Sequence, residues 1–246
     1  MIMALTPLAV AFGLGGLAGL ASSVLVTWLP QNILNEEAQW VAHVKDEPWQ
    51  ALTPHGLRAC AAQAAVNWRS TTGFVAAGAG MAVCLVLTQG ASWTTSLWAV
   101  WLWTLLTAAV IDLKTQLLPD NLTQPLLWLG LLVQTSPTLG TLGLVNAVWG
   151  AVCGYLILWV MDQLYMRWRG ISGVGQGDMK LLAAIGAWLG PQAVPNVLLL
   201  AAVASLIGQA ALRLRQAPTS EAEFAFGPWI ALAAVGYWLF AVATPL

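Results

Sequence analysis

Residues 181–212 read LLAAIGAWLGPQAVPNVLLLAAVASLIGQAAL, a run of 32 residues without a single charge. A helix that crosses a bilayer needs about 20 predominantly apolar residues. The run is therefore either one long apolar helix or two short ones, because Gly190, Pro191 and Pro195 interrupt it and proline ends or kinks a helix. The choice between these alternatives decides how many helices cross the membrane.

The whole chain has the composition of a membrane protein. Of its 246 residues, 59% are hydrophobic and 8% are charged, whereas about 25% of residues are charged in soluble domains. Its 15 tryptophans are typical of aromatic belts at membrane interfaces. The net charge of −1 argues against an electrostatic nucleic-acid binder, which needs a basic surface. The high hydrophobicity excludes a disordered chain.

Eight apolar segments predict an all-α polytopic membrane protein. The first has no preceding basic residue and is longer than the apolar core of a secretory signal, so we interpret it as a retained membrane helix. The segments are Ala4–Leu29, Gly73–Thr88, Trp93–Ile111, Asn121–Thr135, Leu144–Met161, Leu181–Leu189, Val194–Leu212 and Gly227–Thr244.

The basic residues favour eight spans with the amino terminus outside. All nine Lys and Arg then lie in four cytoplasmic segments, namely 30–72, 112–120, 162–180 and 213–226. A single helix over 181–212 would place Lys180 and Arg213 on opposite faces, against the usual cytoplasmic excess of Lys and Arg. The predicted domains are a first transmembrane helix (1–30), a cytoplasmic loop or subdomain inserted after it (31–72) and a transmembrane core (73–246).

Two aspartates are candidate functional residues, because ionisable groups at membrane depth are costly and usually functional. Asp112 follows 19 uncharged residues, and Asp178 lies in the sequence Gly175-Gln-Gly177-Asp178. Both are expected at the cytoplasmic ends of their helices, and glycine permits a tight turn or a close backbone approach. The alternative is that both aspartates cap helices. Capping fits Asp178 better than Asp112, which lies where the helix dipole disfavours a negative charge.

A third aspartate has a simpler interpretation. Asp162 follows a long apolar span and precedes Arg167 and Arg169 by about one turn. An ion pair at the membrane interface accounts for this spacing.

Two carboxylates within hydrogen-bond reach do not both ionise easily. One keeps a proton and polarises a peptide carbonyl, while the other takes a proton from the attacking water. Asp112 and Asp178 therefore indicate acid–base hydrolysis without a metal ion or a covalent intermediate.

At these motifs the sequence resembles the type IV prepilin peptidase family, membrane aspartic proteases of the GxGD type. The resemblance covers about residues 100–246, and the predicted number of spans agrees with the eight of the family. It is carried by three stretches, Asp112-Leu-Lys-Thr-Gln-Leu-Leu-Pro119-Asp120, Gly175-Gln-Gly177-Asp178-Met-Lys180 and Phe226-Gly227-Pro228.

The resemblance implies an endopeptidase that removes the basic leader of type IV prepilins or type II secretion pseudopilins, at the cytoplasmic face of the bacterial inner membrane. It makes Asp112 and Asp178 the catalytic pair, with Gly175 and Gly177 shaping the site. Lys180 is then expected to position Asp178 or to tune its acidity. Pro119-Asp120 is equally typical of a turn that opens a helix, so Asp120 stays outside the catalytic set.

The resemblance also implies a second activity. Many members methylate the new amino terminus with S-adenosylmethionine, and many bind zinc through two CxxC pairs in the first cytoplasmic loop. Here that loop holds only Cys60, with His43 and His55 at irregular spacing, so no zinc is predicted. Ser23 and Trp28 replace an Asn and an Arg that are common in relatives. Proteolysis needs no cofactor, whereas methylation, if it is retained, requires S-adenosylmethionine.

From the residues alone, two other classes of function stay open. A proton-coupled transporter would use Asp112 and Asp178 as relay carboxylates near broken helices, and a membrane scaffold would not use them at all. Transporter sites lie near the midplane of the bilayer, whereas both aspartates are predicted at its edge. The expected partners are a prepilin or pseudopilin helix and the lipid bilayer, with no nucleic acid.

Overall fold

The computed structural model describes residues 15–22, 24–26 and 28–29, five single positions between 76 and 90, and residues 92–214 and 225–243. All regular structure in these residues is helical, which confirms the predicted all-α class. The chain forms two compact units, Met1–Trp103 and Thr104–Leu246. The predicted insertion at 31–72 lies outside the described residues, so the predicted domain division stays a prediction.

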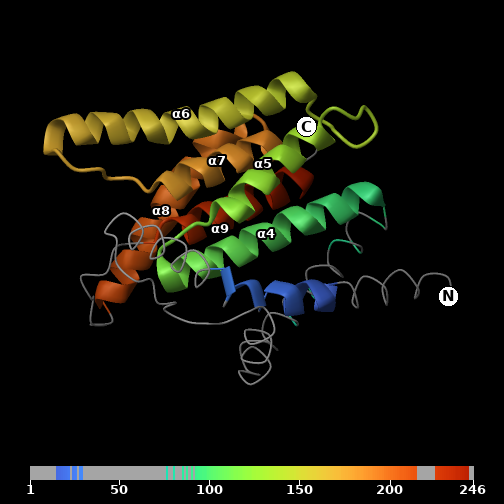
Figure 1. The fold of residues 1–246 in the computed structure, drawn as a ribbon, viewed down its shortest axis with the longest axis horizontal. Helices are drawn as coiled ribbons and strands as arrows, with labels where there is room; N and C mark the ends of the chain where they lie inside the picture. Colours follow the sequence, from blue (N-terminus) through green and yellow to red (C-terminus); the bar gives the residue numbers. More distant parts are fainter. Residues whose placement is uncertain are drawn as a thin grey trace, which may run out of the picture. The chain divides into compact units, whose positions relative to one another are not determined.

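Six helices from residue 93 onward have defined bounds (Figure 1). They follow six of the predicted apolar segments closely. The two main differences are that α6 continues beyond Met161 and that α7 begins before Leu181, because charged and polar residues extend a helix past its apolar part. The helices are α4 (Trp93–Thr115), α5 (Asp120–Val133), α6 (Leu144–Arg169), α7 (Gln176–Leu189), α8 (Ala193–Leu214) and α9 (Gly227–Ala243).

The uncharged run at 181–212 folds as two helices, which confirms the second of the two alternatives. Helix α7 ends at Leu189, and α8 begins at Ala193. Between them Gly190 has a φ of +84°, a backbone conformation that residues with a Cβ rarely adopt. Pro191 follows directly and has no backbone N–H to continue a helix. The local sequence therefore both ends α7 and separates it from α8.

In the described part of the chain, three helices are long and apolar enough to cross a membrane, over Trp93–Thr115, Leu144–Arg169 and Ala193–Ala211. Helices α5 and α7 have 14 residues each, and α9 has 17. These lengths lie at or below the lower end of the usual range for a bilayer-spanning helix. Eight spans and the orientation of the chain therefore stay a prediction.

Helix α7 forms the core of the second unit. Residues Leu181–Trp188 are all buried, as is Met179. A helix that is apolar on all sides is stable only when other helices surround it. Helix α7 packs against α6, α5, α9 and α8, and α6 lies along one side of it in Figure 1. The Nε1 of Trp188 donates a buried hydrogen bond to the carbonyl oxygen of Leu126 on α5, at 2.9 Å.

Glycines bring α6 and α7 into backbone contact. The buried residues of α6 follow one stripe at helical spacing, and they are Ala147, Gly150, Gly154, Leu158 and Asp162. A Cβ built on Gly150 would collide with the backbone carbonyl of Gly186, and a Cβ on Gly186 would collide with that of Gly150. Small residues at such spacing let membrane helices approach closely, so this stripe sets the distance between α6 and α7.

The remaining faces of α6 carry large apolar side chains that are exposed in the isolated chain. Soluble monomers rarely show contiguous apolar patches of more than a few hundred Å², whereas lipid tails solvate such a surface. The surface of α6 is therefore that of a membrane protein. The exposed side chains include Val148, Trp149, Leu156, Trp159, Val160 and Leu164.

We expect Gly150→Ala to destabilise the protein by about 1–3 kcal/mol, because the added methyl overpacks a backbone contact that relaxes only if the helices separate. Gly236→Ala is the matched control, since Gly236 is helical and a Cβ added there would point into open space, with nothing within 4 Å. That variant should be neutral or gain up to about 1 kcal/mol of helix propensity. Unfolding of both variants in detergent micelles measures the difference, and equal stabilities would contradict the proposed contact.

Candidate active site

Asp112 lies in the last turn of α4 and is buried, with 4% of its surface exposed. Its Oδ2 accepts a hydrogen bond from the backbone N–H of Gly227 at 3.0 Å. Gly227 is the first residue of α9, and the N-terminus of a helix favours a negative charge. A Cβ on Gly227 would lie 2.7 Å from this oxygen, so the contact requires glycine. The hydrogen bond and the helix N-terminus thus offset part of the cost of burying the Asp112 carboxylate.

Asp178 lies in the first turn of α7 and is partly buried. It precedes the predicted span at 181–189. Burial and, to a smaller extent, the charge of Asp112 raise the pKa of Asp178 to about 7. A charge perturbs another group in this way only at short range. Asp112 and Asp178 therefore interact electrostatically, and burial favours the protonated form of Asp178.

The two glycines of the Gly175-Gln-Gly177-Asp178 motif have different surroundings. A Cβ on Gly177 would lie 2.6 Å from the Cβ of Leu118, so glycine is needed where the first turn of α7 meets the connection between α4 and α5. Gly175 is the N-cap residue of α7, with ordinary extended angles of φ −64° and ψ 135°. A side chain there would first meet the carboxylate of Asp178, at 3.4 Å.

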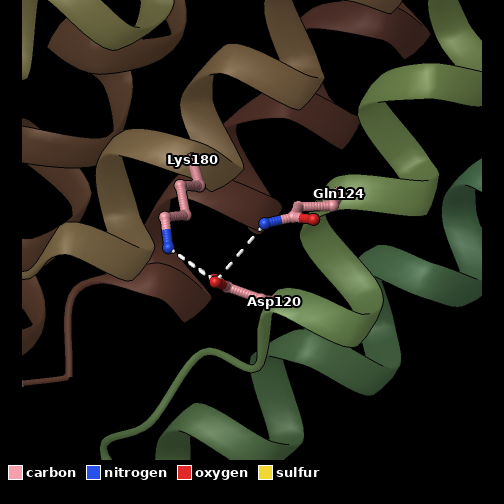
Figure 2. Close-up of polar contacts among 3 residues, drawn as sticks. All are labelled: Asp120, Gln124 and Lys180. Atoms are coloured by element: carbon pink, nitrogen blue, oxygen red, sulfur yellow. Dashed lines mark hydrogen bonds and ion pairs between the residues drawn. The ribbon is translucent and has the colours of Figure 1, made fainter.

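Lys180 contacts Asp120 rather than Asp178 in the described contacts. Its Nζ lies 2.7 Å from both carboxylate oxygens of Asp120, and Gln124 Nε2 donates a longer bond to Asp120 at 3.4 Å. Figure 2 shows the three side chains meeting between α7 and α5. Asp120 is the first residue of α5. The ion pair thus links the first turns of two helices, and it was not anticipated from the sequence.

Neither Asp178 nor Asp120 is the N-cap residue of its helix, although both lie in a first turn, where the helix dipole favours a negative charge. The N-cap residue of α7 is Gly175, and that of α5 is Pro119, and neither helix has a side-chain hydrogen bond at its cap. Helix α5 begins at Asp120, directly after Pro119, which agrees with the interpretation that this pair opens a helix. The carboxylates of Asp178 and Asp120 are therefore free for the contacts described above.

The predicted interfacial ion pair of Asp162 is wrong. Asp162 is buried on α6, and its Oδ1 accepts hydrogen bonds from Ser172 and from the backbone of Gly173 and Val174. Arg169 instead stacks over the ring of Trp168, at 4.9 Å from the ring centroid. Sequence spacing suggested the arginines because they are the nearest opposite charges. The actual donors belong to a loop that folds back onto the helix.

No group of three or more His, Cys, Asp or Glu side chains placed to hold a metal ion occurs among the described residues. His43, His55 and Cys60 lie outside them, so the prediction that the chain binds no zinc is untested. Cys153 on α6 is a free thiol.

The region around these residues is similar to a known protein family. Residues 99–209 match the type IV leader peptidase family, and this range includes Asp112, Asp120, Asp162, Asp178 and Lys180. No solved structure matches the chain.

Several relatives are named prepilin leader peptidase/N-methyltransferase. The protein from Pectobacterium carotovorum subsp. carotovorum is 48% identical over 132 residues, which are 53% of this chain and 46% of the relative. The one from Stutzerimonas stutzeri is 42% identical over 145 residues, 58% of this chain and 49% of the relative. The one from Aeromonas hydrophila is 42% identical over 154 residues, 62% of this chain and 52% of the relative.

The chain spans about half the length of the curated relatives that it matches. The matched range contains Asp112, Asp178 and two of the three stretches on which the resemblance was based, whereas Phe226-Gly227-Pro228 lies beyond it. Residues 99–209 of this chain are therefore similar to the type IV leader peptidase family.

Proposed function

We propose that this chain is a prepilin peptidase that removes the basic leader of type IV prepilins or type II secretion pseudopilins. The catalytic pair is Asp112 and Asp178. The observation that carries the proposal is that Leu118 lies against both Gly177, next to Asp178, and Gly227, which bonds Asp112. The residues belong to or adjoin a region that matches the leader peptidase family. The names of the relatives support the substrate class.

In the proposed reaction Asp112 is the general base and Asp178 the general acid. The N–H of Gly227 and the start of α9 stabilise the charge of Asp112. A water between the carboxylates loses a proton to Asp112 as its oxygen attacks the peptide carbonyl carbon, and Asp178 gives its proton to the carbonyl oxygen. When the C–N bond breaks, Asp112 protonates the leaving amine and Asp178 recovers a proton from the new carboxyl group, which restores both residues.

The proposed topology places this chemistry at the cytoplasmic face of the bacterial inner membrane. Eight spans with the amino terminus outside put all nine Lys and Arg in cytoplasmic segments. Both aspartates then lie at helix ends on the cytoplasmic side. A prepilin carries its apolar helix directly after the leader, so that helix can stay in the bilayer while the peptide bond reaches the site.

The proposal includes N-methylation of the new amino terminus, with S-adenosylmethionine as the methyl donor. It rests on the names of the relatives. The described residues provide no set of side chains that identifies a site for this donor. The comparisons do not favour the alternative of a proton-coupled transporter, because the matched family and the matched relatives are peptidases.

Replacing either aspartate by asparagine should lower the rate of leader removal by about 100- to 10,000-fold, the usual contribution of a general acid or base. Purified chain, a prepilin and S-adenosylmethionine in detergent are the reactants. Mass spectrometry of the products reports the lost leader and, in the same spectrum, one added methyl on the new amino terminus. Cleavage by either variant at the wild-type rate would exclude the assigned pair.

The same variants carry an internal control for folding. Above pH 7 the wild type holds two like charges in one site, and Asp178→Asn removes one of them. Because the folded state binds this proton more tightly than the unfolded state, wild-type stability falls as the pH rises towards 7. Relative to the wild type at the same pH, Asp178→Asn should therefore raise the melting temperature at about pH 8 more than at about pH 5. A variant that melts below the wild type at both pH values would show that misfolding explains its inactivity.

The rate should also depend on pH in a specific way. The active form keeps a proton on Asp178, whose pKa is about 7, so kcat/KM should fall as the pH rises through this value. On the acid side it should fall as the pair takes up a second proton, which gives a bell-shaped profile that belongs to the pair. Initial rates from about pH 5 to about pH 9 measure this profile. A kcat/KM that does not fall above about pH 7 would contradict the assignment of Asp178 as the general acid.

Lys180 is proposed to position the first turn of α7 through Asp120. The two side chains are 32% and 48% exposed, and such pairs contribute about 0–1 kcal/mol. Lys180→Met and Asp120→Asn should therefore lower kcat by about 2- to 5-fold each. The double variant Asp120→Lys with Lys180→Asp exchanges the two charges and can form the ion pair again. It should therefore lose less activity than the sum of the losses caused by the two single substitutions. A loss equal to that sum would argue against the link.

A further inference from the structure

A buried carboxylate on α6 has no role in the proposed reaction. Asp162 is 4% exposed, and its Oδ1 accepts three hydrogen bonds. The donors are the Oγ of Ser172 at 2.8 Å, the N–H of Gly173 at 2.8 Å and the N–H of Val174 at 3.1 Å. A buried carboxylate is costly unless donors surround it. Here three donors converge on one oxygen, which fixes their positions relative to α6.

All three donors belong to the connection between α6 and α7. This connection begins at Gly170, which ends α6 with a φ of 78°, and it leads to Gly175, the N-cap residue of α7. Most of its residues are exposed, so apolar burial contributes little to its order. Gly173 lies against the ring of Tyr165, where a Cβ would be 2.6 Å from the ring. The hydrogen bonds that the loop donates to Asp162 are therefore its main anchor among the described contacts.

The anchored residues lead directly into the site. Val174 precedes the N-cap residue, and the N–H of Asp178 donates to the carbonyl of Gly175 at 3.1 Å. The place where the loop enters α7 thus determines where the first turn of α7 begins. Asp178 lies in that turn, so its distance from Asp112 depends on a loop that Asp162 holds.

We propose that Asp162 is a positioning residue for Asp178, acting by hydrogen bonds that fix the connection between α6 and α7. This inference rests on the proposed peptidase function, in which Asp178 must meet Asp112. Asp162 contributes through geometry, because its Oδ1 only has to accept the three hydrogen bonds from the loop. An asparagine can place its carbonyl oxygen in the same position, whereas alanine cannot.

The test compares Asp162→Ala and Asp162→Asn with a control on the same helix. Misplacement of a catalytic group by about 1 Å costs about 100-fold in rate, so Asp162→Ala should lower kcat by about 10- to 100-fold. It should also move the alkaline side of the pH profile to lower pH, because Asp178 loses the influence of Asp112. Asp162→Asn should keep the wild-type profile and recover most of kcat.

Asn146→Ala is the matched control. Asn146 lies at the other end of α6 and is exposed, and its side chain bonds only the carbonyl of Leu142 among the described contacts, at 2.9 Å. That variant should keep both kcat and the pH profile. A wild-type pH profile for Asp162→Ala would overturn the proposal, as would an Asp162→Asn variant impaired as strongly as the alanine variant.

Hydrogen–deuterium exchange of the full chain in detergent separates this inference from the proposed function. Asp162→Ala should speed exchange of the amides of Gly173 and Val174, whereas Asp162→Asn and Asn146→Ala should not. If the wild type cleaves no prepilin, the proposed function fails, yet the exchange still tests the anchor. If cleavage is normal and exchange is unchanged by Asp162→Ala, the anchor alone fails.

Discussion

The close contact between the backbones of α6 and α7 is the constraint on which the second unit depends. It is possible because Gly150 and Gly186 face each other without side chains. Helix α7 has too few residues and too many apolar ones to stand alone, so its position is set by the helices around it. Helix α7 begins only two residues before Asp178, and its buried residues run to Trp188. The packing of α7 therefore also sets the position of Asp178.

The polar contacts near the site act at the ends of helices rather than along them. Gly227 at the start of α9 reaches Asp112, and Asp120 at the start of α5 reaches Lys180. Asp162 reaches the loop that leads into α7. The apolar interior fixes the distances between helices, but it does not fix the rotation of a first turn. Directional bonds are suited to that task, since hydrogen bonds weaken steeply away from their preferred angles.

Much of this arrangement could be predicted from the sequence. The break at Gly190, Pro191 and Pro195 left one or two helices open, and the positions of the Lys and Arg residues favoured two, as observed. The two aspartates at matched helix ends predicted a joint site, which stays a prediction. The partners of Lys180 and Asp162 could not be predicted, since they depend on which loop folds back onto which helix. The N–H of Gly227 was also missed because a backbone donor has no signal of its own in the sequence, although Phe226-Gly227-Pro228 marked the place.

The shortness of α7 has a consequence for how water reaches the site. Fourteen residues rise about 21 Å along a helix, which is about 9 Å less than the thickness of the hydrocarbon layer. If α7 crosses the membrane with its far end level with the opposite interface, the turn that holds Asp178 lies inside the leaflet, and polar groups there draw solvent inward. The proposed hydrolysis consumes a water molecule at this turn, and a helix shorter than the hydrocarbon layer gives that water a short route from the aqueous phase.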